Sequence, residues 1–249
     1  MKKLFRAFLM CLSMFSVIPT PGSVWDEEAR PLMTLFLPAV GLVIGGVWTL
    51  LAYLTRLLEL PGLVGAAILC AYPFLVTGGI HMDGYLDVTD AVKSYRDLEE
   101  RRRILKDPNV GSFAVLAGIL LVLAQFAFFA SAGEDADLFT LILIPAVSRT
   151  AAALAVTVLR PMAVSEYSGA YRKGVKRSHA AILSVLLAAE LASGFVFLGR
   201  FGFAGLAVIL GYCHHVYKAF HSLDGMSGDV SGYALTFAEV CGIAVYTLI

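Results

Sequence analysis

Three aspartates in the middle of the chain lie at helical spacing. Asp83, Asp87 and Asp90 stand at positions i, i+4 and i+7, so a helix through them would place all three carboxylates on one face. Like charges at this spacing repel each other, and a bound cation offsets that cost. Mg²⁺ is usually shared between one or two carboxylates and the phosphates of a substrate. The spacing therefore predicts a magnesium site for phosphoryl chemistry, and the alternative is a solvated acidic helix end.

A further carboxylate precedes the last apolar segment of the chain. Ser227, Gly228 and Asp229 follow one another there. Glycine at such a position lets the backbone approach a ligand closely. Asp229 would complete a metal site with the first three aspartates, whereas the alternative is a turn followed by a helix cap at Asp229.

The segment 106–112 has the features of a helix start. Asp107 suits an N-cap, and the proline that follows it suits the first helical turn. Amide groups exposed there, together with Lys106 and the flexible Gly111 before Ser112, would bind an anion opposite the acidic face. Capping without any ligand is the alternative.

Two other ionisable residues lie in or beside apolar segments. His81 is close to Asp83 and is a candidate proton carrier, although a hydrogen bond at a helix end explains it equally well. Arg149 lies near the middle of an apolar segment, where an unpaired cation costs about 2.5 to 3.5 kcal/mol. Glu190 and Glu239 are its candidate ion-pair partners, and a substrate phosphate is the third option.

The elements that must position these residues are membrane helices. The chain of 249 residues is 59% hydrophobic and 15% charged, against about 25% charged residues in a soluble domain. Seven segments are long enough to cross or nearly cross about 30 Å of hydrocarbon, at residues 32–55, 63–80, 112–131, 138–158, 180–198, 203–220 and 232–249. The sequence predicts an all-α, polytopic integral membrane protein, with one membrane-embedded domain over residues 1–249.

The charged residues outside these segments predict the orientation. Residues 4–18 are apolar but too short to span, and Arg6 interrupts them, so we expect a retained interfacial or re-entrant helix rather than a cleaved signal. Basic residues gather in the N-terminus, in 93–106 and in 160–177, while 134–137 is acidic. The positive-inside rule then predicts that the loops 83–107, 160–179 and 221–231 face the cytoplasm.

Several functional classes are not favoured by the sequence. The formal net charge is zero, so no overall field recruits nucleic acid. The chain has no GxxxxGK[ST] phosphate loop, no GxGxxG motif after a strand and no HExxH motif. A bound nucleotide would therefore have to be held by other means.

The same residues carry a resemblance to a known family. The run from Gly78 to Asp90, followed by Lys106-Asp107 and Gly111-Ser112, resembles the cobalamin synthase family, the adenosylcobinamide-GDP ribazoletransferases. Ser148-Arg149 and Ser227-Gly228-Asp229 resemble it as well, so the similarity extends over nearly the whole chain. The sequence departs from the usual family pattern at Leu86, Ala91, Ser112, Ala114, Asp224 and Ser227.

The resemblance implies a Mg²⁺-dependent, multi-pass enzyme of a prokaryotic cytoplasmic (inner) membrane, with its active face in the cytoplasm. It would join α-ribazole, or α-ribazole 5′-phosphate, to adenosylcobinamide-GDP and release GMP. A ribose 5′-hydroxyl is expected to attack the cobinamide phosphate. Asp83, Asp87 and Asp90 match the family's acidic motif, and Lys106 and Asp107 match its Lys-Asp pair. Asp229 matches its Gly-Asp motif near the end of the chain.

Chemistry and resemblance together suggest a role for each group. Asp83, Asp87 and Asp90 would hold Mg²⁺ with Asp229, while Lys106 and Arg149 would neutralise the diphosphate. His81 and Asp90 are the two candidates for the general base. The segments that would bind the substrate contain Gly111, Ser112, Ser227 and Gly228.

Two other functions and one structural question stay open at this stage. A membrane CDP-alcohol phosphotransferase also begins its signature with Asp-Gly, but its later Ala-Arg and spaced Gly, Asp and Asp do not follow Asp83. A secondary transporter would place polar groups near the midplane of two related halves, and no related halves are evident. The lower base and the oligomeric state are open, with a homo-oligomer among the options.

Overall fold

The computed structural model describes residues 2–22, 25–133, 135–163 and 177–249. Over these ranges the protein is helical, as predicted, and its only β pairing is an isolated bridge between Pro161 and Met226. Glu134 and most of the basic loop 160–177 lie outside the described residues. The α-helices are α1 (Lys2–Phe15), α2 (Met33–Leu57), α3 (Gly62–Val76), α4 (Ile80–Lys93), α5 (Leu98–Ile104), α6 (Ser112–Ser131), α7 (Thr140–Val158), α9 (Arg177–Leu198), α10 (Phe203–Leu223) and α11 (Gly228–Leu248).

The helices have the length and apolarity of membrane spans. Five helical stretches of the described chain are long and apolar enough to cross a bilayer, or six if the bent pair α3 and α4 is one span. The longest stretch, Arg177–Leu223, contains α9 and α10 joined by the 3₁₀ turn η2 (Gly199–Gly202). The chain is therefore a multi-pass membrane protein, although the expected number of seven crossings is not confirmed.

The helix boundaries follow the apolar pattern except at one place. The predicted segment 112–131 coincides with α6, and those at 138–158 and 203–220 differ from α7 and α10 by a few residues. The segment 63–80 does not continue as one helix, because α3 ends at Val76 and α4 starts after a bend of 86°. Gly78 and Gly79 form this bend with φ of 61° and 78°, a left-handed conformation that glycine adopts without strain.

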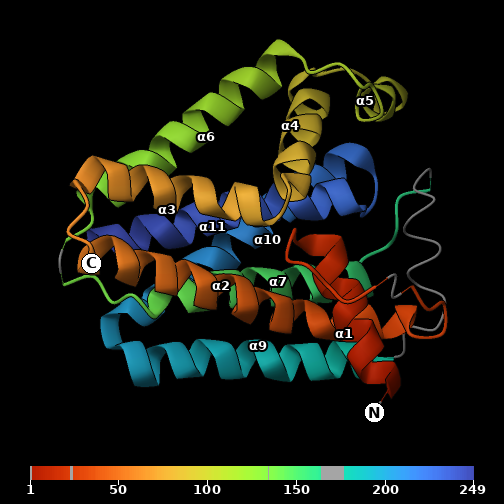
Figure 1. Cartoon of the computed structure of the whole chain (residues 1–249). Coiled ribbons are helices and arrows are strands. Elements are labelled where there is room, and N and C mark those ends of the chain that lie inside the picture. The colour runs from red at the N-terminus through yellow and green to blue at the C-terminus, as the bar shows by residue number, and fades with distance from the viewer. Residues whose placement is uncertain (1, 23–24, 134, 164–176) are drawn as a thin grey trace.

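The centre of the bundle is built from α2, α7, α10 and α11 (Figure 1). Small residues bring α2 and α7 into close contact, since a methyl group on Gly41 would lie 2.4 Å from the carbonyl oxygen of Pro145. The same holds for Gly45, where it would lie 2.6 Å from the Cα of Ile142. α9 is largely exposed along its length, as expected for a helix that faces lipid.

The predicted N-terminal helix is present as α1 and packs on α2. Phe8 of α1 contacts Phe36 of α2 with ring centroids 6.1 Å apart. Lys3 and Arg6 lie on the outer side of α1 and pair with Glu28 and Asp26. The helix thus covers the start of α2, at the end of the bundle where α4 also begins (Figure 1).

Candidate active site

The predicted acidic face exists on α4. Asp83, Asp87 and Asp90 all lie within this one helix, so their spacing places them on a common side. In Figure 1, α4 stands steeply against α3 and projects from the layer formed by α2, α3 and α11. The bend at Gly78 and Gly79 therefore directs the aspartates away from α3 rather than along it.

The N-terminal turn of α11 brings Asp229 to this acidic face. Gly84 lies so close to α11 that a methyl group on it would be 2.9 Å from the Asp229 carbonyl oxygen and 3.0 Å from the Asp229 Cα. The charged groups that act on the Asp87 carboxyl are Asp83, Asp229 and Asp90, all of them acidic. The structure thus places Asp229 near the aspartates of α4.

The donor set suits Mg²⁺ in chemical type. Among the residues that the structure describes, no three His, Cys, Asp or Glu side chains converge closely enough to hold a metal ion by themselves. Mg²⁺ does not require such a cage, because it usually binds one or two carboxylates and completes its shell with water and substrate phosphates. Asp83, Asp87 and Asp229 therefore fit a site that a phosphorylated substrate completes.

Asp90 is engaged differently from the other aspartates. One of its carboxylate oxygens accepts a short hydrogen bond from the amide of Gly111, and the other accepts one of 2.9 Å from the amide of Ala114. These amides belong to the first turn of α6, so Asp90 caps that helix from a distant part of the chain. Glycine suits position 111, because a methyl group there would displace the Asp90 carboxylate.

This cap corrects the helix start predicted within 106–112. α6 begins at Ser112 rather than near Asp107, and the amides expected to bind an anion from outside are bonded to Asp90. Asp107 instead accepts hydrogen bonds from the backbone and side chain of Asn109, which lower the pKa of its carboxyl below the usual value. Lys106 and Asp107 are exposed residues of the loop between α5 and α6.

Arg149 forms an ion pair with one of its two candidate acidic partners. It is fully buried in α7 and forms a short ion pair with Glu239 of α11, which also accepts a 2.8 Å hydrogen bond from Ser148. Glu190 accepts a hydrogen bond from Thr150 instead. The contact with Glu239 supports the ion-pair interpretation of Arg149 over a role in binding a substrate phosphate.

The loop before α11 is held by ion pairs that the sequence analysis did not identify. Asp224 ends α10 with a left-handed φ of 56° and pairs with Arg160 and with Arg102 of α5. The Arg160 hydrogen bond is the main reason that the pKa of Asp224 lies below its usual range. Two backbone hydrogen bonds between 160–162 and Met226 fix the loop further.

One signal in the sequence pointed to this position. Asp224 precedes a glycine, and Asp tolerates the left-handed conformation better than most side chains. Ser227 then caps α11 by accepting a hydrogen bond from the Val230 amide, so the predicted cap lies at Ser227 rather than at Asp229.

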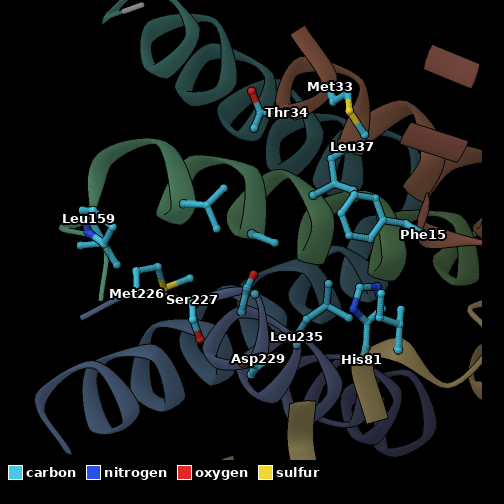
Figure 2. Close-up of a pocket in the computed structure, with 17 residues that line it drawn as sticks. Phe15, Met33, Thr34, Leu37, His81, Leu159, Met226, Ser227, Asp229 and Leu235 are labelled. Carbon is cyan, nitrogen blue, oxygen red and sulfur yellow. The ribbon is translucent and has the colours of Figure 1, made fainter. Parts of the chain in front are cut away.

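A cavity of about 380 Å³ lies beside Asp229. Figure 2 shows side chains from α1, α2, α4, α7 and α11 around it, with Asp229, Ser227 and His81 along one side. The His81 ring stacks on Phe15 with centroids 6.0 Å apart. The buried His81 Nε2 has no hydrogen-bond partner among the described residues.

Fold and site together define a class of protein: a multi-pass, all-helical membrane enzyme with clustered carboxylates and an adjoining cavity at one end of the bundle. A model of the family described as cobalamin-5-phosphate synthase matches residues 7–247. The chain belongs to this family.

Similar proteins from three bacteria support the same assignment. A Clostridium botulinum (strain Alaska E43 / Type E3) protein is 36% identical, with 98% of this chain and 97% of the relative covered. A Clostridium perfringens (strain 13 / Type A) protein is 34% identical, and the match covers both chains in full. A protein from Lachnoclostridium phytofermentans is 30% identical, with 98% of this chain and 94% of the relative covered. All three are described as adenosylcobinamide-GDP ribazoletransferase. No solved structure matches the chain significantly.

Proposed function

We propose that the protein transfers adenosylcobinamide phosphate from adenosylcobinamide-GDP to α-ribazole or α-ribazole 5′-phosphate and releases GMP. This is the reaction that assembles the nucleotide loop of cobalamin. The observation that carries the proposal is the position of Asp229 beside the acidic face of α4, in a chain that belongs to the cobalamin-5-phosphate synthase family.

The expected attack by the ribose 5′-hydroxyl does not fit both acceptors. An acceptor that already carries a 5′-phosphate has no free 5′-hydroxyl, and the family description names a 5-phosphate of the product. A single mechanism for both acceptors therefore requires a secondary hydroxyl of the ribose as the nucleophile. Its oxygen bonds to the cobinamide phosphorus, and the bond from that phosphorus to the bridging oxygen breaks as GMP leaves.

Most of the catalysis in such a displacement comes from positioning and charge neutralisation. Mg²⁺, held by Asp83, Asp87 and Asp229, would neutralise the negative charge of the diphosphate. Lys106 is our candidate for a further positive charge on it, from the loop after α5. We assign Arg149 a structural role, because Glu239 already pairs with it.

The proton of the attacking hydroxyl needs an acceptor. Both oxygens of Asp90 accept hydrogen bonds from the first turn of α6, which favours a structural role for that carboxylate. His81 lines the cavity, and its buried Nε2 has no hydrogen-bond partner among the described residues. We therefore favour His81 Nε2 as the proton acceptor.

We also propose that this end of the bundle faces the cytoplasm in a prokaryotic inner membrane. Arg101 and Arg102 of α5 donate hydrogen bonds to the backbone of residues 222–224, which places these cations at the same end as Asp229. An excess of cations at one end is typical of the cytoplasmic side.

A GMP-release assay tests the proposal. Purified protein in detergent, given Mg²⁺, adenosylcobinamide-GDP and α-ribazole, is expected to release GMP, to stop on chelation and to recover when Mg²⁺ is restored. Asp83→Asn is expected to abolish release, while Asp97→Asn serves as the control, because Asp97 only caps α5 and Asn caps equally well. Release of CMP from a CDP-alcohol, without release of GMP, would contradict the assignment.

The acceptor hydroxyl is tested in the same assay. α-Ribazole 5′-phosphate is expected to release GMP and to give a product that keeps its 5′-phosphate. Reaction with α-ribazole, and none with α-ribazole 5′-phosphate, would show that the 5′-hydroxyl is the nucleophile.

A further inference from the structure

The cavity beside Asp229 is a separate feature from the acidic face of α4. It lies between the start of α2, the end of α7 and the first turn of α11, and Phe15 and His81 form part of its lining. Of the acidic residues in the described chain, only Asp229 lines it. The cavity therefore shares one residue, Asp229, with the cluster of aspartates and extends away from that cluster into the bundle.

The two sides of the cavity differ in chemistry. On the side of α4 and α11, polar groups are contributed by His81, Ser227, Asp229 and Ser231. On the side of α2 and α7, the lining is mostly apolar and includes Leu37 and Val156, and its polar side chain is that of Thr34. Figure 2 shows Leu37 and Thr34 on this side. An occupant of this space needs one polar part and one apolar part that lie side by side.

The volume limits the size of that occupant. Sites for small molecules measure about 300 to 1,000 Å³, so a cavity of about 380 Å³ suits a compact ligand. A corrinoid macrocycle that carries a guanosine diphosphate is far larger than a nucleoside. A nucleoside with a bicyclic aromatic base has the required size, with hydroxyls at one end and a flat apolar ring system at the other.

We infer that this cavity binds the acceptor nucleoside, with its aromatic base against Leu37 and Val156 and its ribose toward Asp229 and His81. The inference rests on the proposed function and adds to it the location of one substrate. The ribose hydroxyls then lie at Asp229, the acidic residue that the cavity shares with the cluster of aspartates. The corrinoid donor stays outside the cavity, along α4.

A matched pair of substitutions on α7 tests this assignment. Val156→Phe adds a ring to the apolar side of the cavity, whereas Val158→Phe makes the same change at an exposed position that does not line it. Val156→Phe is expected to raise the KM for α-ribazole about tenfold or more, because overfilling a packed site costs on the order of one tenfold step in affinity. The KM for adenosylcobinamide-GDP is expected to stay within twofold in both variants.

Binding of α-ribazole alone, measured by isothermal titration calorimetry in detergent, keeps the test informative if turnover falls for another reason. Val156→Phe is expected to weaken this binding, and Val158→Phe to preserve it. Unchanged α-ribazole binding by Val156→Phe, or a raised KM for the corrinoid substrate alone, would overturn the inference even though the wild type releases GMP. Failure of the proposed function looks different, because the wild type would then release no GMP.

Discussion

Gly84 of α4 contacts the backbone of Asp229, and this contact sets the distance between the two parts of the candidate site. A Cβ at Gly84 would lie 2.9 Å from the Asp229 carbonyl oxygen, closer than side-chain carbons are normally found. The Asp229 main chain has little room to yield, since Val230 is buried and Ser227 caps the same turn. The lack of a side chain at Gly84 is thus what lets the first turn of α11, with Asp229, approach α4 this closely.

We predict that Gly84→Ala lowers GMP release about a hundredfold, because displacing catalytic groups by about 1 Å has effects of that size. The control is Gly46→Ala in α2, where a methyl group would meet nothing within 4 Å. Steady-state rates in detergent, with thermal unfolding measured on the same samples, check the prediction. A Gly84→Ala enzyme with wild-type activity would show that the distance between α4 and α11 is unimportant.

We predict that Asp90→Asn acts mainly on stability. The carbonyl oxygen of an asparagine can accept a hydrogen bond from one of the two amides, of Gly111 or Ala114. Its NH₂ group then faces the other amide, which is also a donor. One partly buried amide then loses its acceptor, at a cost of about 1 to 3 kcal/mol. Thermal unfolding is therefore expected to shift downward in Asp90→Asn but not in Asp83→Asn, whose side chain is exposed. Complete loss of turnover with an unchanged unfolding temperature would instead identify Asp90 as a metal ligand or base.

Local spacing was enough to predict the acidic face and most helix boundaries. Asp83, Asp87 and Asp90 needed only a continuous helix to share one side, and α4 provides it. The bend of 86° between α3 and α4 was not predictable in the same way, because two adjacent glycines permit many backbone conformations and tertiary packing selects one. The cap on α6 depends on that bend, since α4 must stand beside α6 for Asp90 to reach Gly111.

The partner of Arg149 shows a second limit of sequence reasoning. Depth along a helix made Glu190 a reasonable partner, but depth does not determine which way a side chain faces around the helix axis. In the structure α11 directs Glu239 toward Arg149, while α9 directs Glu190 toward Thr150. The ion pairs of Asp224 were missed for a similar reason, because Arg102 and Arg160 are distant in sequence and meet only in the folded chain.

We predict that breaking the pair between Arg149 and Glu239 is far more damaging than replacing it. Arg149→Met alone or Glu239→Met alone leaves an uncompensated buried charge, which costs about 3 to 5 kcal/mol. The double variant Arg149→Met/Glu239→Met is expected to recover much of this stability and most of the activity. Unfolding temperature and GMP release are measured for all three variants. A stable but inactive double variant would show that Arg149 binds substrate phosphate.

The ion pairs of Asp224 lead to a prediction about positioning. Asp224→Asn keeps a residue that tolerates the left-handed conformation but removes the charge that holds Arg160 and Arg102. We expect the KM for the substrates to rise severalfold with little change in kcat, because the loop before Asp229 loses its anchors. Asp135→Asn is the matched control, since it removes a similarly exposed ion pair, with Arg200, that joins the loop before α7 to η2.

The pH dependence of this effect distinguishes an ion pair from a neutral hydrogen bond at Asp224. The hydrogen bond from Arg160 lowers the pKa of Asp224 in the folded protein. The stabilisation from this ion pair is therefore fully present above the ordinary Asp pKa of about 3.9, and it is lost as the pH falls through the lowered value. The ratio of KM between Asp224→Asn and the wild type is therefore expected to be constant from about pH 6 to pH 8, where the carboxylate stays fully charged. A ratio that approaches one near neutral pH would mean that Asp224 does not hold the loop through its charge.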